Sequence, residues 1–239
     1  MDSRRAEAFS DGVFAVAITV LVFNLLGIGS HNLTAHPYHV LLSAWPNYLA
    51  YAVSFLTIGI MWVNHHAMFA AVTKVDRRLL IINMLLLMGV VAIPFPTALV
   101  AEQLAARAAA VGKADISVAG AGGQAAAVAY GVVMIAISIG YSVMWQYIAS
   151  HPKRLGAARL MEQPRVAYLQ FNAGVFGYIA ATLIAAFVSG LVALAIYGLL
   201  AIYYMFEHLP GLRRGGESGS GEAEPAGETR GETDGETRG

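Results

Sequence analysis

Six long apolar runs dominate this chain and leave few folds open to it. A helix needs about 20 mostly apolar residues to cross a bilayer core about 30 Å thick. The runs cover residues 11–28, 46–72, 79–101, 125–148, 166–188 and 191–206. They are apolar on all sides, without the alternation of a barrel strand, and backbone groups in lipid must be paired internally. We therefore predict an all-α membrane protein with six transmembrane helices.

The composition agrees with this prediction and removes several classes of function. Of the 239 residues, 57% are hydrophobic and 13% are charged, whereas soluble domains average about a quarter charged. The absence of cysteine excludes disulfides, thiolate metal ligands and cysteine nucleophiles. The formal net charge is zero, so the chain offers no overall basic character to nucleic acid, and we expect no nucleic-acid partner.

Lys and Arg are distributed unevenly between the two sides of the predicted bundle. Eleven basic residues would share one side: Arg4, Arg5, Lys74, Arg77, Arg78, Lys153, Arg154, Arg159, Arg165, Arg213 and Arg214. The other side would hold Arg107 and Lys113. Because an excess of basic residues marks the cytoplasmic side, we predict that both termini are cytoplasmic, as an even number of spans requires. A cleaved signal peptide is the competing interpretation of residues 1–30, but no small-x-small cleavage site stands out after it.

The end of the chain differs from the rest. Residues 215–239 contain seven acids and two Arg, against thirteen basic and eight acidic residues before them. Three Gly-Glu-Thr copies occur there, and no apolar residue is larger than Ala or Pro. Such a segment cannot bury enough surface to offset the entropy of ordering. We predict a six-span membrane unit over residues 1–212 and a disordered acidic tail over residues 213–239.

A few polar side chains fall near the predicted cytoplasmic ends of the first three spans. They are Ser10 and Asp11 in the first span, His65 and His66 in the second, and Asn83 in the third. A carboxylate at this depth needs a partner, and we expect a His or Arg5 to pair with Asp11. The simplest interpretation of this polar layer is a structural clamp between helices, and a proton relay or gate is the alternative.

The same residues do not form a recognisable catalytic site. Adjacent side chains on a helix point about 100° apart, so His65 and His66 cannot easily bind one metal together. No second carboxylate joins Asp11 within the membrane, and no Ser-His-Asp arrangement, Gly-rich phosphate loop or zincin spacing occurs. We predict no enzymatic activity, no cofactor and no metal site. A membrane-embedded enzyme or haem protein that uses one of the two histidines remains an alternative.

One face of the first span carries an apolar stripe. It consists of Phe9, Val16, Val20 and Phe23, which lie within about 60° of one another at helical spacing. Thr19 flanks the stripe, and Asp11 lies about 140° from Val16. On periodicity alone, the stripe faces lipid or another helix.

Several of these motifs together resemble a known family. They are Arg5-x-x-x-Phe9-Ser10-Asp11, Trp62-x-x-His65-His66, Asn83 and Pro94-Phe95-Pro96. The first resembles the signature of the potassium channel family named for transmembrane protein 175, the lysosomal potassium channel of animals, and the others are similar to its bacterial members. The resemblance covers about residues 4–210. Animal members resemble two six-span units joined in one chain, so a single unit implies a bacterial homotetramer.

The resemblance implies a role for the stripe and for the polar layer. Four first-span helices would line the pore, Val16, Val20 and Phe23 would form its apolar constriction, and Thr19 would flank it. Many family members have Ile or Leu at the place of Val16, which implies a wider ring here that Phe23 could compensate. The network that braces the pore helix would comprise Arg5, Ser10, Asp11, His65, His66 and Asn83.

The resemblance therefore implies a potassium-favouring cation channel in the cell membrane, with potassium ions and the lipid bilayer as partners. A secondary transporter or exporter of a small solute or ion is the alternative. A transporter would favour inverted repeats or broken helices near the middle of the membrane. No convincing repeat relates spans 1–3 to spans 4–6.

Overall fold

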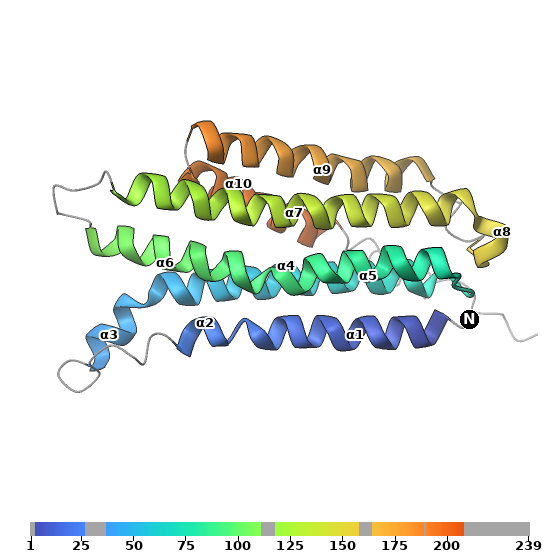
Figure 1. Ribbon diagram of the computed structural model, residues 1–239, viewed down its shortest axis with the longest axis horizontal. Coiled ribbons are helices and arrows are strands. Elements are labelled where there is room, and N and C mark those ends of the chain that lie inside the picture. Colours follow the sequence, from blue (N-terminus) through green and yellow to red (C-terminus); the bar gives the residue numbers. More distant parts are fainter. Residues whose placement is uncertain (1–2, 27–36, 111–117, 158–163, 189, 208–239) are drawn as a thin grey trace, which may run out of the picture.

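The computed structural model describes residues 3–26, 37–110, 118–157, 164–188 and 190–207. Within these ranges every regular element is a helix (Figure 1). The helices are α1 (Ser3–Val20), α2 (Phe23–Leu26), α3 (Pro37–Ser43), α4 (Trp45–Ala70), α5 (Arg77–Ala92), α6 (Pro94–Ala110), α7 (Val118–Ser150), α8 (Pro152–Leu155), α9 (Pro164–Phe187) and α10 (Gly190–Glu207). The predicted acidic tail, residues 213–239, lies outside the described residues.

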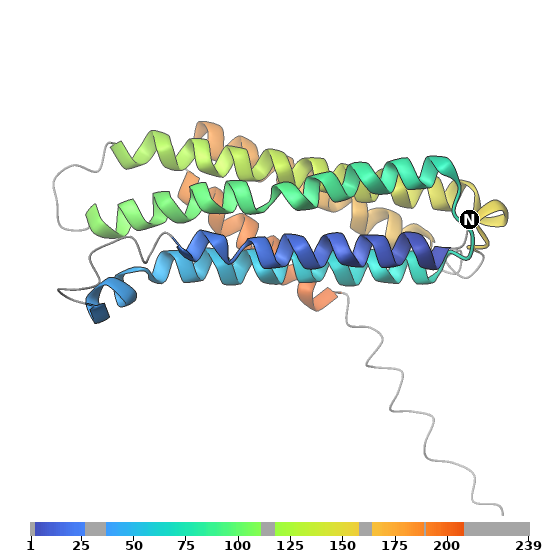
Figure 2. The same ribbon diagram turned by 60° about the horizontal axis from the view of Figure 1, so that its bottom comes forward.

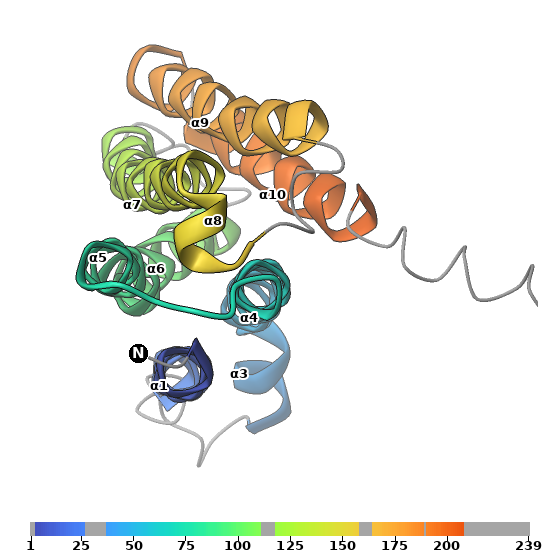
Figure 3. The same cartoon turned by 90° about the vertical axis from the view of Figure 1, so that its right-hand side faces the viewer.

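Helices α1, α4, α5, α6 and α7 run lengthwise side by side, and α10 is inclined to them (Figures 1 and 2). Viewed along the bundle, α1 lies at one margin, next to α4 and α5, and α9 lies at the opposite margin (Figure 3). The longest helix, α7, packs against α5, α6, α9 and α10 and joins the two halves. Among the described helices, α1 therefore has neighbours on one side only.

Four of the predicted spans correspond to helical stretches long and apolar enough to cross a membrane. Within the described residues these are Ser3–Leu26, Trp45–Ala70, Arg77–Ala109 and Ala121–Ser150. The runs predicted at 166–188 and 191–206 form α9 and α10, which count as shorter apolar helices over Val175–Phe187 and Val192–Ile202. The all-helical fold with membrane-spanning helices is therefore confirmed, and the count of six spans stays a prediction.

The first helix begins eight residues before the predicted apolar run. The run was placed from Asp11, but α1 starts at Ser3 and ends at Val20, with α2 continuing to Leu26. Hydropathy detects the part of a helix that lies in lipid, whereas the helix itself continues into the polar boundary of the bilayer. The polar motif from Arg5 to Asp11 therefore occupies the first turns of a continuous helix.

Two glycines allow α5 and α7 to approach closely. A Cβ atom on Gly89 would lie 2.8 Å from Cγ1 of Ile137, and one on Gly140 would lie 3.0 Å from Cδ1 of Leu86. In lipid, helices associate through such close packing because the hydrophobic effect no longer drives them together. This contact holds α5, a neighbour of α1, against the rest of the bundle.

Two turns join at the end of the bundle that also holds the start of α1. Asp76 caps α5, because its Oδ1 accepts a hydrogen bond from the backbone N–H of Leu79 at 2.9 Å. Its Oδ2 accepts one from the Tyr147 hydroxyl at 2.6 Å and lies 3.1 Å from Nη2 of Arg154. One carboxylate thus connects the α4–α5 turn to both α7 and α8.

Candidate functional site: the first helix and its polar layer

The two sides of α1 differ sharply in exposure. Phe14, Ala17 and Leu21 are at most 1% exposed and face α4 and α5. On the opposite side, Val16 is 56% exposed. The subunit therefore covers one face of this helix and leaves an apolar face open.

The open face holds the residues singled out by the sequence. Phe9 is 56% exposed, Thr19 is exposed and Val20 is half-buried. The Thr19 hydroxyl donates to the backbone carbonyl of Val16 at 2.9 Å. Because that hydroxyl is used within the helix, the open face presents mainly carbon atoms around Val16.

The helix changes pitch between Val20 and Phe23. Backbone N–H groups at Val22, Asn24 and Leu25 bond to carbonyls three residues earlier, at 3.2, 3.1 and 2.9 Å. Such bonds tighten a helix locally, so a uniform 100° per residue does not place Phe23. Phe23, the first residue of α2, is nevertheless exposed.

A side-chain hydrogen bond links this pitch change to another helix interruption. The Asn24 amide Nδ2 donates to the carbonyl of Pro94 at 3.2 Å. Pro94 begins α6, directly after the end of α5 at Ala92, where proline removes a helical hydrogen bond. The break in the first span and the break in the third are therefore held together.

On the packed side, a directed chain of hydrogen bonds joins three helices. His65 Nε2 lies 2.7 Å from Asn83 Oδ1, which can only accept, so the imidazole nitrogen donates. Asn83 Nδ2 donates to Ser10 Oγ at 2.9 Å, and Ser10 donates to the carbonyl of Ala6 at 2.9 Å. All three side chains are at most 2% exposed. Asn83 of α5 thereby connects α4 to α1.

Aromatic rings fix the orientation of His65 within this chain. Its ring stacks on Phe69 with centroids 4.5 Å apart, and Phe14 of α1 lies 5.3 Å away at a tilt. His65 is therefore packed as a buried side chain between two helices, with Nε2 directed at Asn83.

A second set of contacts joins α1 to α4 nearer the open side. The indole Nε1 of Trp62 donates to Asp11 Oδ1 at 2.8 Å. His66 Nδ1 lies 2.9 Å from Glu7 Oε1, and the rings of Trp62 and His66 are 5.8 Å apart. These two contacts are one helical turn apart on each helix.

The partner of Asp11 differs from the expected one. The structure gives Asp11 a hydrogen bond from Trp62, where a His or Arg5 was expected. His65 instead bonds to Asn83, and His66 lies within ion-pair distance of Glu7. Arg5 is exposed near the start of α1. Sequence reasoning missed the roles of Glu7 and Trp62. Glu7 lies four residues before Asp11, and Trp62 lies four residues before His66, so each pair shares one helix face.

The described residues contain no group of three or more His, Cys, Asp or Glu side chains that could hold a metal ion. The polar layer consists instead of hydroxyl, amide, imidazole, indole and carboxylate groups that bond to one another across helices. Its geometry is that of an interhelical joint next to an apolar helix face.

Comparison with known proteins relates this arrangement to a family. The family model described as "Endosomal/lysosomal potassium channel TMEM175" matches residues 5–94. A protein named as a potassium channel from Streptomyces collinus is 39% identical over 209 residues, which cover 87% of this chain and 94% of that protein. The human protein named "Endosomal/lysosomal proton channel TMEM175" is 32% identical over 101 residues, 39% of this chain and 20% of its own length.

Solved structures agree with the sequence match. The crystal structure of a lysosomal potassium-selective channel TMEM175 homolog from Chamaesiphon minutus has 35% identity and a TM-score of 0.68, and the match covers 86% of this chain and 97% of that one. These relatives are ion channels, in line with the expectation that this chain is not an enzyme. The protein whose sequence and fold are described above belongs to the TMEM175 channel family.

Proposed function

We propose that this chain is a subunit of a potassium-favouring cation channel whose pore is lined by α1 from four copies. In this proposal Val16, Val20 and Phe23 form an apolar constriction, Thr19 flanks it, and the polar network of Arg5, Ser10, Asp11, His65, His66 and Asn83 braces the helix from behind. The observation that carries the proposal is the open apolar face of α1, opposite a face that is almost completely packed.

The position of α1 supports an assembly of several copies. It lies at the margin of the bundle (Figure 3), so one subunit does not surround a path lined by this helix. A closed ring of identical subunits would bring four such faces together around one axis. Two relatives named as potassium channels support the proposed channel function, because they match this chain over most of its length.

An apolar ring can favour potassium without binding it. Carbon-lined walls supply no oxygen ligands, so an ion passes with a distorted or partly removed water shell. Potassium holds that shell less tightly than sodium does, and the ring can also close by dewetting. We expect a modest preference for potassium, because selection here rests on dehydration alone.

The proposal includes the predicted topology. Helices α9 and α10 complete six membrane crossings, residues 1–212 form the channel unit, and both termini are cytoplasmic because the basic loops are on their side. The protein is placed in the cell membrane as a multi-pass protein, and residues 213–239 extend from it as an acidic tail.

Flux measurements on purified protein in liposomes test the proposal. We expect passive potassium flux that exceeds sodium flux, and Val16→Asn should lower this ratio because an amide supplies ligands to a partly dehydrated ion. Val132→Asn is a matched control, since Val132 is also 56% exposed but belongs to α7, which packs mainly against α5, α6, α9 and α10. Proton flux is measured in parallel because the animal relatives are named proton channels.

Two results would contradict the proposal. One is the absence of passive potassium flux from protein that remains folded and assembled. The other is an equal effect of Val16→Asn and Val132→Asn, which would place the open face of α1 in lipid.

A further inference from the structure

The α4–α5 turn and the α7–α8 turn form one continuous surface. The backbone N–H groups of Thr73 and Lys74 both bond to the carbonyl of Leu155 at 3.1 Å. Gly156 ends α8 with a left-handed φ of 65°, and a Cβ there would collide with the Thr73 hydroxyl. Basic side chains from both turns are thereby held on the same rigid corner.

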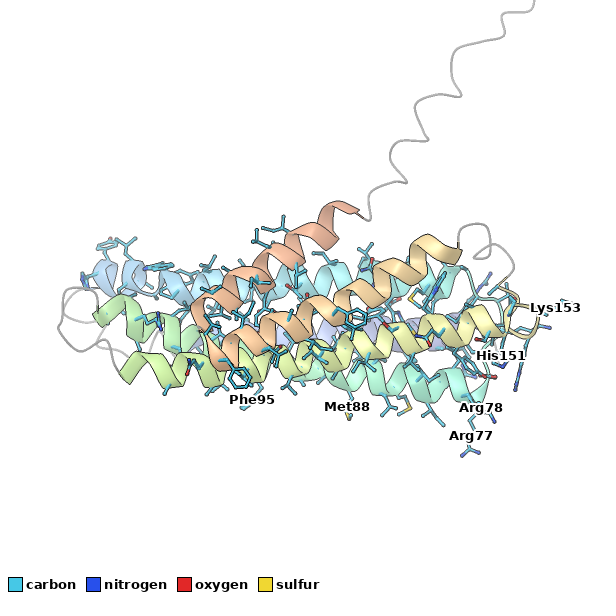
Figure 4. All side chains as sticks on the ribbon, turned by 90° about the horizontal axis from the view of Figure 1, so that it is seen from above. Arg77, Arg78, Met88, Phe95, His151 and Lys153 are labelled. Carbon is cyan, nitrogen blue, oxygen red and sulfur yellow. The ribbon has the colours of Figure 1, made fainter. Side chains whose placement is uncertain are left out.

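This corner carries a large excess of positive charge. Five basic side chains are exposed on it: Lys74, Arg77, Arg78, Lys153 and Arg154. Residues 71–78 and 151–157 contain a single acid, Asp76. Figure 4 shows Arg77, Arg78 and Lys153 at the same end of the molecule.

The one carboxylate is already engaged. Burial alone would raise the pKa of Asp76, but hydrogen bonds from Tyr147 and from the α5 backbone, with the positive charge of Arg154, lower it below its ordinary value. Asp76 therefore stays ionised and offsets Arg154. In the described part of the chain, no carboxylate lies within ion-pair distance of Lys74, Arg77, Arg78 or Lys153.

An exposed apolar stripe continues from Arg77 along the same side of the third span. Its members are Ile81, Met84, Met88 and Phe95, which are 49, 61, 67 and 68% exposed. At helical spacing Ile81, Met84 and Met88 lie within about 40° of Arg77. Beyond the break at Pro94, Phe95 lies along the same edge of the bundle as Arg77 and Met88 in Figure 4. The helical stretch Arg77–Ala109 is long and apolar enough to cross a membrane, and it begins at Arg77 itself. Because basic residues gather at the boundary of the bilayer, we place this arginine at headgroup depth.

We propose that Arg77, Arg78 and Lys153 bind the headgroup of an anionic phospholipid of the cytoplasmic leaflet, whose acyl chain lies along the stripe of Ile81, Met84 and Met88. Charge complementarity accounts for the headgroup, since basic groups at the membrane boundary attract anionic lipids. The exposed apolar stripe accounts for the binding of the acyl chain. The inference rests on the proposed cytoplasmic orientation of this end, and not on conduction.

A lipid fits both features better than the acidic tail of this chain does. Residues 215–239 have the right sign of charge, but no apolar side chain larger than Ala or Pro that could cover the stripe. A small free anion would likewise satisfy the arginines and leave the stripe unused.

Native mass spectrometry of the full chain tests this site. The protein is released from detergent with equal amounts of phosphatidylglycerol and phosphatidylcholine of identical acyl chains. We expect phosphatidylglycerol to be retained preferentially, and Arg77→Gln with Arg78→Gln to lower its retention about 25-fold, at about fivefold per arginine. Met84→Asn, which leaves the charge unchanged, should also reduce retention. Circular dichroism and gel filtration establish that each variant remains folded.

Arg107→Gln is the matched control, because Arg107 lies near the end of α6, at the opposite end of the bundle. It should leave phosphatidylglycerol retention unchanged. The proposal is overturned if the two lipids are retained equally, or if Arg107→Gln has the same effect as the double variant. It is also overturned if deletion of residues 215–239 raises lipid retention as much as the arginine variants lower it, because the tail would then be the occupant. None of these readouts depends on ion flux.

Discussion

The packed and the open faces of α1 differ in their side chains and in their contacts, although they belong to one helix. The packed face uses a fully buried Phe14, small residues and a hydrogen-bonded Ser10. The open face has apolar side chains at the same depth that the described residues leave uncovered. The packed face therefore fixes the position of the helix in the subunit, and the open face is available for contacts outside the subunit.

This difference separates stability from function. Residues on the packed face should affect unfolding strongly and selectivity weakly, and residues on the open face should do the reverse. The following predictions test that separation, in order of decreasing expected effect on stability.

The largest effect is expected from a pair of phenylalanines on the same helical segment. Phe14→Ala leaves a cavity beside His65 and should lower the free energy of unfolding by about 3 kcal/mol. Phe23→Ala, at a side chain that is 62% exposed, should cost less than about 1 kcal/mol and change the potassium-to-sodium flux ratio. Thermal unfolding in detergent and liposome flux measure the two effects. Equal destabilisation by both changes would remove the distinction between the faces.

The next effect concerns the hydrogen-bond chain behind α1. Asn83→Ala deprives both His65 and Ser10 of a partner and should cost about 2 kcal/mol, because buried polar groups lose their bonds. Ser10→Ala should cost about 1 kcal/mol. The double variant should cost less than the sum, since both changes remove the same bond. Strict additivity in urea or thermal unfolding would mean that the two residues act separately.

A change remote from α1 should affect stability and leave selectivity alone. Asp76→Ala removes the cap of α5 and should cost about 1 kcal/mol at pH 7. The pKa of Asp76 is lowered in the folded state, so its contribution is complete above the ordinary carboxyl pKa and is lost as the pH falls below about 4. The difference in unfolding temperature between the wild type and the variant should therefore shrink from pH 7 to pH 3. Asp76→Asn, which can still cap the helix, is the control.

The smallest effect on stability is expected at the link between the two helix breaks. Asn24→Ala removes the hydrogen bond to the Pro94 carbonyl and should cost less than about 1 kcal/mol. Because Asn24 adjoins Phe23, the flux ratio should nevertheless change. Ser43→Ala removes a purely local hydrogen bond to the Val40 carbonyl in α3 and is the comparison. If both variants conduct like the wild type, the link does not position Phe23.

Hydropathy could identify the helices but not all of their limits. A span of about 20 apolar residues is a physical requirement of the bilayer, so the long helices appear at the predicted runs. The first turns of α1 were missed because Arg5 and Glu7 lie at the polar boundary, where hydropathy falls before the helix ends. The division of the third run into α5 and α6 at Pro94 follows from proline, although the run was treated as one span.

The neighbours within the polar layer were harder to predict than its membership. The depth of Ser10, His65 and Asn83 followed from the predicted orientation of the spans, and these side chains do bond to one another. The choice of Trp62 for Asp11 depends on how far α4 is rotated relative to α1, which no single-helix pattern records. The assignment of Val16, Val20 and Phe23 to a constriction stays a prediction.

The amide of Asn83 has a consequence for the movement of acid across the membrane. It receives a hydrogen at its oxygen and gives a different one from its nitrogen, and neither atom can pick up a proton on one side and release it on the other. The row from His65 to Ser10 therefore provides no proton relay through Asn83. If α1 lines the pore as proposed, protons that pass through the channel would move through pore water and not along this row.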